Sequence, residues 1–310
     1  MAEAESNTRI EIRELTKDHG TQRVVDHLTF DVLPGRVTGF LGPNGAGKST
    51  TLRLLLGLER PTHGAATIGG IRFTDLDRPL HRVGALLDPQ AAPAGRRARD
   101  HLLALAVSNG IPPARVDRVL EQAGIASVGR RRIGTFSLGM RQRLGMAAAL
   151  LGDPGVLLLD EPTNGLDPEG IIWIRELMRG LAAEGRTVFV SSHLMAESAA
   201  FVDHLVVLGR GRLLADTSME EFISARSARR VRLRTSEPDR MGAALAREGF
   251  ELVAAEEGRW AVEGIRADRI GALAAREGIP VLELADERAS LEQAYLDLTA
   301  DRAQFSATTV

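Results

Sequence analysis

The sequence predicts an α/β fold built on a parallel sheet and followed by a small α+β domain. Three observations support this prediction. A glycine-rich loop at residues 42–50 lies between an apolar segment and a helical pattern. A second apolar segment, Val156–Leu159, is followed directly by two carboxylates. Residues 231–300 alternate between short strand patterns and helix patterns in the order β-α-β-β-α-β.

The glycine-rich loop follows an expected strand at Val37–Leu41 and leads into a helix expected near Lys48. Its residues are Gly42, Pro43, Asn44, Gly45, Ala46, Gly47, Lys48, Ser49 and Thr50. Glycines at this spacing let backbone N–H groups point inward toward phosphates, and the positive end of the helix adds partial charge. Lys48 can then reach the β- and γ-phosphates while Ser49 binds Mg²⁺. The loop predicts nucleoside triphosphate binding; the alternative is a glycine-rich turn that matches by chance.

The second apolar segment has the pattern of a strand buried on both faces of a parallel sheet. Asp160 follows at its carboxyl end, where it can complete the Mg²⁺ site. Because side chains alternate along a strand, Glu161 is expected to point elsewhere and to polarise an attacking water. The alternative interpretation is a pair of solvated carboxylates at a strand end.

A helix is expected to begin within Phe136–Arg143, with Ser137 as its N-cap. Gly139, two residues later, permits close backbone approach. A helix start with a small hydroxyl and a glycine can bind an anion. One chain does not need two phosphate sites, so the second site is expected to serve a neighbouring subunit.

These motifs resemble the ATP-binding cassette (ABC) ATPases over roughly residues 8–217. The family's Leu-Ser-Gly-Gly-Gln signature corresponds to Phe136–Met140, which keeps the serine and the second glycine. The resemblance implies that Ser137 and Gly139 contact the γ-phosphate bound by the opposite subunit. It also implies that Asp167 belongs to the loop that crosses between subunits, and that His193 is the switch histidine at the γ-phosphate.

Two positions depart from the family's pattern. An aromatic residue usually stacks on adenine, and this chain offers His19, whose alternative role is a solvated turn residue. A glutamine usually joins the Mg²⁺ site to the membrane partner after a strand, here Arg82–Leu87. Matching the end of that strand gives Asp88, whereas Gln90 follows two residues later and is favoured as the equivalent.

The resemblance implies a P-loop ATPase with a RecA-like core, a β subdomain and a helical subdomain at about 91–152. We expect the ATPase domain at 8–217, a linker helix at 218–230 and a ferredoxin-like domain at 231–300. The implied cofactors are ATP and Mg²⁺. The implied partners are a separate multi-span membrane permease and a second copy of the chain in a head-to-tail homodimer. The closing segment of the C-terminal domain, Leu291–Thr299, resembles the end of cassettes from drug- or antibiotic-exporting systems with separate membrane subunits.

The overall composition indicates which partners and which cellular location to expect. The net charge is −2, so no strongly basic surface is indicated and no nucleic acid is expected as a partner. The absence of cysteine fits a reducing cytoplasm, and residues 1–7 lack a signal-peptide pattern. We expect a cytoplasmic protein held at the inner face of the cell membrane by its permease. The alternatives are a non-transport cassette ATPase of translation or DNA repair, and a non-catalytic nucleotide sensor.

Overall fold

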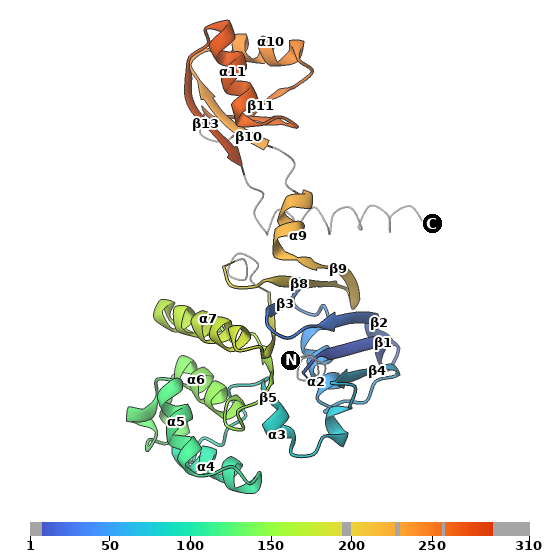
Figure 1. The fold of residues 1–310 in the computed structure, drawn as a ribbon, viewed down its shortest axis with the longest axis vertical. Helices are drawn as coiled ribbons and strands as arrows, with labels where there is room; N and C mark the ends of the chain where they lie inside the picture. The colour runs from blue at the N-terminus through green and yellow to red at the C-terminus, as the bar shows by residue number, and fades with distance from the viewer. Residues whose placement is uncertain (1–7, 194–199, 227–229, 256–257, 288–310) are drawn as a thin grey trace. The chain divides into compact units, whose positions relative to one another are not determined.

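The computed structural model describes residues 8–193, 200–226, 230–255 and 258–287 (Figure 1). The chain divides into two compact units, residues 1–219 and residues 220–310. The first unit contains a mixed six-stranded sheet, a three-stranded antiparallel sheet and several helices. The second unit contains a four-stranded antiparallel sheet. Among the described residues, no helix combines the length and the apolar character needed to cross a bilayer.

The six-stranded sheet forms the centre of the first unit. Its strands lie in the order β5 (Val83–Leu86), β6 (Val156–Asp160), β7 (Thr187–Ser192), β3 (Val37–Leu41), β8 (His204–Gly209) and β9 (Arg212–Ser218). The first five strands are parallel, and β9 pairs antiparallel with β8 at the edge. Every residue of β3 and β7 is buried, as expected for strands covered on both faces.

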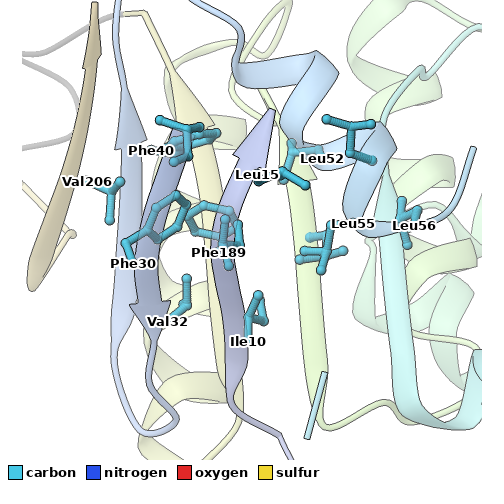
Figure 2. Packing of buried hydrophobic residues seen from close by; sticks show 14 of the residues in the cluster. Ile10, Leu15, Phe30, Val32, Phe40, Leu52, Leu55, Leu56, Phe189 and Val206 are labelled. Carbon is cyan, nitrogen blue, oxygen red and sulfur yellow. The ribbon is translucent and has the colours of Figure 1, made fainter. Parts of the chain in front are cut away.

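The antiparallel sheet has the order β2 (Gln22–Val32), β1 (Ile10–His19) and β4 (His63–Ile68). Three phenylalanines join it to the parallel sheet: the ring centroids of Phe30 and Phe40 are 5.7 Å apart, and Phe189 lies 6.0 Å and 4.9 Å from them. Figure 2 shows these rings between Val206 and Leu15 in one continuous apolar cluster. Packing of these large side chains fixes the two sheets relative to each other.

The helices of the first unit are α2 (Lys48–Leu55), α3 (Pro79–Arg82), α4 (Ala98–Ser108), α5 (Ala114–Gln122), α6 (Leu138–Ala149) and α7 (Pro168–Ala183), with short 3₁₀ turns at 73–75, 126–128 and 133–135. A further helix, α9 (Met219–Arg226), begins at the final residue of the first unit. α4, α5 and α6 all contact one another and form the helical segment between β5 and β6.

The approach of α6 to β5 gives a stability prediction. A Cβ atom on Gly84 would lie 2.1 Å from the backbone carbonyl oxygen of Ala149. We expect Gly84→Ala to destabilise the protein by about 2–3 kcal/mol because neither backbone can move freely. No atom of the described residues lies within 4 Å of such a Cβ at Gly180 in α7, so Gly180→Ala should stabilise the protein by about 0.5–1 kcal/mol. Denaturant unfolding of both variants tests this, and equal stability of the two would contradict the packing.

The second unit has the element order β10 (Arg230–Thr235), α10 (Pro238–Arg247), β11 (Leu252–Ala254), β12 (Trp260–Glu263), α11 (Ala267–Glu277) and β13 (Val281–Glu287). The antiparallel sheet has the order β11-β12-β10-β13. Its buried core includes Leu233 from the sheet, Leu245 from α10 and Ile270 from α11. The sequence pattern also predicts a helix at residues 290–298, which lies outside the described residues.

Candidate nucleotide-binding site

The carboxyl ends of three neighbouring parallel strands meet at one edge of the six-stranded sheet. β7 lies between β3 and β6, so residues that follow these strands are brought together. The register pairs Leu41 with Ser192 and Asp160 with Ser191. The loop after β3 and the carboxylates after β6 therefore share this edge, which is where α/β sheets bind their ligands.

The loop between β3 and α2 requires glycine at two points of close approach. A Cβ on Gly42 would lie 2.7 Å from the carbonyl oxygen of Leu208. Gly47 adopts φ +102°, and a Cβ there would lie 2.6 Å from the carbonyl oxygen of Val24. The loop is therefore held between β2 and β8, and only glycine fits at either position. These close approaches of neighbouring strands constrain the backbone shape of the loop.

Lys48 begins α2 and is buried, with 6% of its surface exposed. Its Nζ donates to the carbonyl oxygens of Gly42, at 2.7 Å, and Pro43, at 3.3 Å, and lies 3.7 Å from Oε1 of Glu161. Burial lowers the pKa of Lys48, and the carboxylates of Glu161 and Asp160 oppose that shift. The ammonium group is thus held at the centre of the site by weak partners that phosphate oxygens can replace.

Glu161 directly follows β6 and adopts φ +49°, a left-handed conformation that is rare for residues other than glycine. Its Oε2 lies 2.8 Å from Nδ1 of His193, while its Oε1 faces Lys48. The expectation that strand alternation would direct Glu161 is wrong, because the strand ends at Asp160. A left-handed turn aims this side chain between the lysine and the histidine.

Asp160, Ser49 and Thr50 lie at the same edge of the sheet. The Ser191 hydroxyl donates to the Asp160 carboxylate, which fixes the orientation of that side chain. Ser49 is exposed at the first turn of α2, and Thr50 follows it. Mg²⁺ prefers hard oxygen ligands and is commonly bound by one or two protein groups together with substrate phosphates. The exposed Ser49 hydroxyl and the Asp160 carboxylate, whose orientation is fixed by Ser191, are oxygen ligands suited to such an ion.

The predicted signature residues form the start of α6. Ser137 is its N-cap, and its Oγ accepts a hydrogen bond of 3.2 Å from the Met140 N–H. A Cβ on Gly139 would lie 3.0 Å from the carbonyl oxygen of Gly165, so the helix start packs closely on the following loop. Asp167 caps α7 by accepting a 2.8 Å hydrogen bond from the Gly170 N–H. The start of α6 therefore packs against the loop before α7, which is the predicted intersubunit loop.

Two predicted residues lie apart from the group around Lys48. Nε2 of His19, at the end of β1, lies 3.2 Å from Oε2 of Glu59. Gln90 is exposed, and its backbone N–H donates to Oδ1 of Asp88 at 2.7 Å. Within the described ranges of the chain, no polar contact joins either side chain to Lys48.

Two further residues at the site carry no signal in the motifs. Ser191 is fully buried in β7, and its Oγ accepts a hydrogen bond of 3.0 Å from the Glu161 N–H. Gln142 is buried in α6, and its Nε2 donates to the carbonyl oxygens of Glu161 and Asn164, both at 3.1 Å. The pairing of β6 with β7 would have identified Ser191. No local pattern identifies Gln142, because long polar side chains on helices are usually exposed.

Comparison with known proteins agrees with this geometry. The sequence profile of the ABC transporter family matches residues 25–164, and that of a domain of unknown function, DUF8746, matches residues 229–292. The bacitracin transport ATP-binding protein BcrA of Bacillus licheniformis is 44% identical over 219 residues, which cover 70% of this chain and 72% of that protein.

Solved structures share the fold of the first unit. An ATP-binding subunit of an ABC transporter superposes with a TM-score of 0.65 and 28% identity, covering 70% of this chain and 93% of that one. The dimeric cassette MJ0796, bound to ADP and phosphate, gives a TM-score of 0.61 at 23% identity over 68% of this chain and 98% of its own. The chain belongs to the ABC transporter family, as an ATP-binding subunit.

Proposed function

We propose that this chain hydrolyses ATP and that hydrolysis drives a transporter. The observation that carries the proposal is the position of the Glu161 carboxylate, which lies 3.7 Å from Nζ of Lys48 and 2.8 Å from Nδ1 of His193. A carboxylate between a phosphate-binding cation and a histidine is placed to orient a water at the γ-phosphate. The non-catalytic sensor is disfavoured because all three groups, together with Asp160, are present.

Each residue has a separate part in the proposed reaction. Glu161 accepts a hydrogen bond from the attacking water and directs its oxygen toward phosphorus. Lys48 and His193 stabilise negative charge on the transferred phosphoryl group. Ser49 and Asp160 would hold Mg²⁺, which supplies further positive charge at the phosphates, and Gln90 is proposed to extend this site. His19 is proposed to lie against adenine, since β2, which follows its turn, contacts the phosphate loop at Val24.

The proposed working unit is a head-to-tail homodimer. Ser137 and Gly139 would bind the γ-phosphate held by the partner, and the loop containing Asp167 would cross the interface. Support comes from the exposed Ser137, at the start of a capped helix where N–H groups can bind an anion. The relative MJ0796 is a dimer. ATP would then close the dimer, and hydrolysis would open it.

The proposed membrane partner is a separate multi-span permease, and the proposed cargo is a drug, antibiotic or lipid moved outward. The relative BcrA carries bacitracin transport in its name, which favours an antibiotic. The proposed location of the chain is the cytoplasm, at the inner face of the cell membrane. The helical segment containing Arg96 and Arg97, both exposed, is the proposed docking surface for the permease.

Co-purification from native membranes tests the transport role. A tagged chain extracted in mild detergent is expected to retain a multi-span membrane protein in stoichiometric amount. Glu161→Gln with ATP serves as a second sample, in which the complex should be retained at least as well. Recovery on ribosomes or DNA instead of a membrane protein would support the translation or repair alternative and contradict transport.

Removal of the switch histidine gives a kinetic prediction. His193→Ala is expected to lower kcat by about 10²-fold, comparable to the loss of one preorganised charge-stabilising donor. KM for ATP should change by less than about threefold, because the phosphate loop and Lys48 remain intact. Steady-state phosphate release measures both constants. A large rise in KM with unchanged kcat would instead place His193 in ground-state binding.

A further inference from the structure

The backbone of Glu161 is held from two sides by side chains that belong to different elements. Its N–H donates to Oγ of Ser191 in β7 at 3.0 Å, and its carbonyl oxygen accepts from Nε2 of Gln142 in α6 at 3.1 Å. Between these two bonds the residue has φ +49°. Non-glycine residues in such conformations cost about 1–3 kcal/mol and persist only where the surroundings enforce them.

Ser191 joins the two carboxylate residues of the site. Its hydroxyl donates to the Asp160 carboxylate and accepts from the Glu161 N–H, so one buried oxygen orients both residues. The parallel pairing of Asp160 with Ser191 places the hydroxyl there. A threonine at this position keeps the hydroxyl, whereas an alanine leaves the Glu161 N–H without an acceptor.

Gln142 joins the signature helix to the turn after β6. It is 3% exposed, and its amide nitrogen bridges the carbonyl oxygens of Glu161 and Asn164. Its Oε1 is buried and has no hydrogen-bond partner among the described residues, which costs about 1–3 kcal/mol. The burial of this amide is explained by its two donor bonds, because they hold the left-handed turn that directs the Glu161 side chain.

We propose that Gln142 and Ser191 form a backbone clamp, defined as these two side chains and their bonds to Glu161. The clamp sets the direction of the Glu161 carboxylate, and both members are positioning residues. This inference rests on the proposed function, in which Glu161 orients the attacking water. Through Gln142, the clamp also ties Glu161 to α6, the helix that begins after Ser137. Movement of α6 on binding the partner's nucleotide would therefore be transmitted to the water-orienting carboxylate.

Purified full-length variants test the clamp. Gln142→Met keeps the side-chain length but removes the donor, and Ser191→Ala removes the hydroxyl. Each is expected to lower kcat by about 10–100-fold, because a misplacement of about 1 Å costs up to about 10²-fold, with KM for ATP within about threefold. Ser191→Thr should restore kcat to within about threefold of the wild type. If Gln142→Met does not fold, the comparison of Ser191→Ala with Ser191→Thr tests the clamp by itself.

A matched control comes from the same helix. Arg143 donates to the carbonyl oxygen of Ala123 at 3.0 Å and lies over the ring of Trp173, away from Glu161. Arg143→Met loses a comparable bond to a carbonyl and should lower the unfolding midpoint while leaving kcat within about twofold. If Gln142→Met behaves like this control, with only its stability reduced, the clamp is wrong.

A double-variant comparison separates positioning from general damage. In a Glu161→Gln background, adding Gln142→Met should not reduce the residual hydrolysis further, because the group that it positions is already lost. A further tenfold fall would contradict the clamp. The proposed function fails separately: it is wrong if Glu161→Gln keeps wild-type turnover, whereas the clamp alone is wrong if Glu161→Gln is inactive and both clamp variants turn over normally.

Discussion

Glu161→Gln is expected to lower kcat for ATP hydrolysis by about 10³-fold while ATP still binds. The substitution keeps the size of the side chain but removes the negative charge of the carboxylate that accepts a hydrogen bond from the attacking water and orients it. In the wild type the carboxylate lies 3.7 Å from Lys48 and 2.8 Å from His193. An amide of the same size should fit there and make weaker contacts to both residues. Phosphate release under steady-state conditions measures kcat, and equilibrium titration measures the affinity for ATP.

The exposed glutamate Glu169 in the first turn of α7 provides a control for the loss of a carboxylate nearby in sequence. Glu169→Gln should leave kcat within about twofold. If the Glu161 variant retains more than about a tenth of the wild-type kcat, Glu161 does not orient the water. A loss of ATP affinity equal to the loss of kcat would place the carboxylate in binding instead.

Lys48→Met is expected to weaken ATP binding by about 100-fold and to remove measurable turnover. The substitution deletes a buried cation whose carbonyl and carboxylate partners would be exchanged for phosphate oxygens. Charge-assisted bonds to phosphate contribute about 1.5–3 kcal/mol each, and about 2.7 kcal/mol corresponds to a 100-fold change in affinity. Titration with ATP in the presence of Mg²⁺ measures the effect.

The stability of this variant without nucleotide distinguishes binding from folding. Methionine at position 48 keeps the buried apolar stem but removes the cation beside Glu161, so we expect the unliganded variant to fold with a lower unfolding midpoint. Lys17 is the other lysine of the sequence and donates to the carbonyl oxygen of Arg60 at the surface. Lys17→Met should bind ATP within about twofold of the wild type. Equal affinity of both variants would contradict the role of Lys48.

The features predicted from the sequence are those that depend on local patterns. The ABC family and the α/β fold with a small α+β domain are confirmed. The Ser137 cap and the strand Val37–Leu41 occur as predicted, because capping chemistry and buried apolar runs are local signals. Strand order then places the loop, Asp160 and His193 at one edge.

The features that the sequence did not predict depend on tertiary contacts. The left-handed conformation of Glu161 results from bonds to Ser191 and Gln142, which come from elements about 30 and 19 residues away. No periodicity encodes such bonds. Nε2 of His19 lies 3.2 Å from Oε2 of Glu59, which belongs to the connection between α2 and β4. Because side-chain partners of this kind are set by packing, local patterns leave the roles of such residues open.

The most direct test of the account is the mass of the Glu161→Gln protein in solution with and without ATP and Mg²⁺. Light scattering after size exclusion is expected to show a monomer of 33.4 kDa without nucleotide and about twice that mass with it. Adding Ser137→Arg should prevent the dimer while leaving ATP bound, because the second phosphate contact is blocked. A protein that stays monomeric at saturating ATP, alone and with its membrane partner, would contradict a nucleotide shared between two subunits.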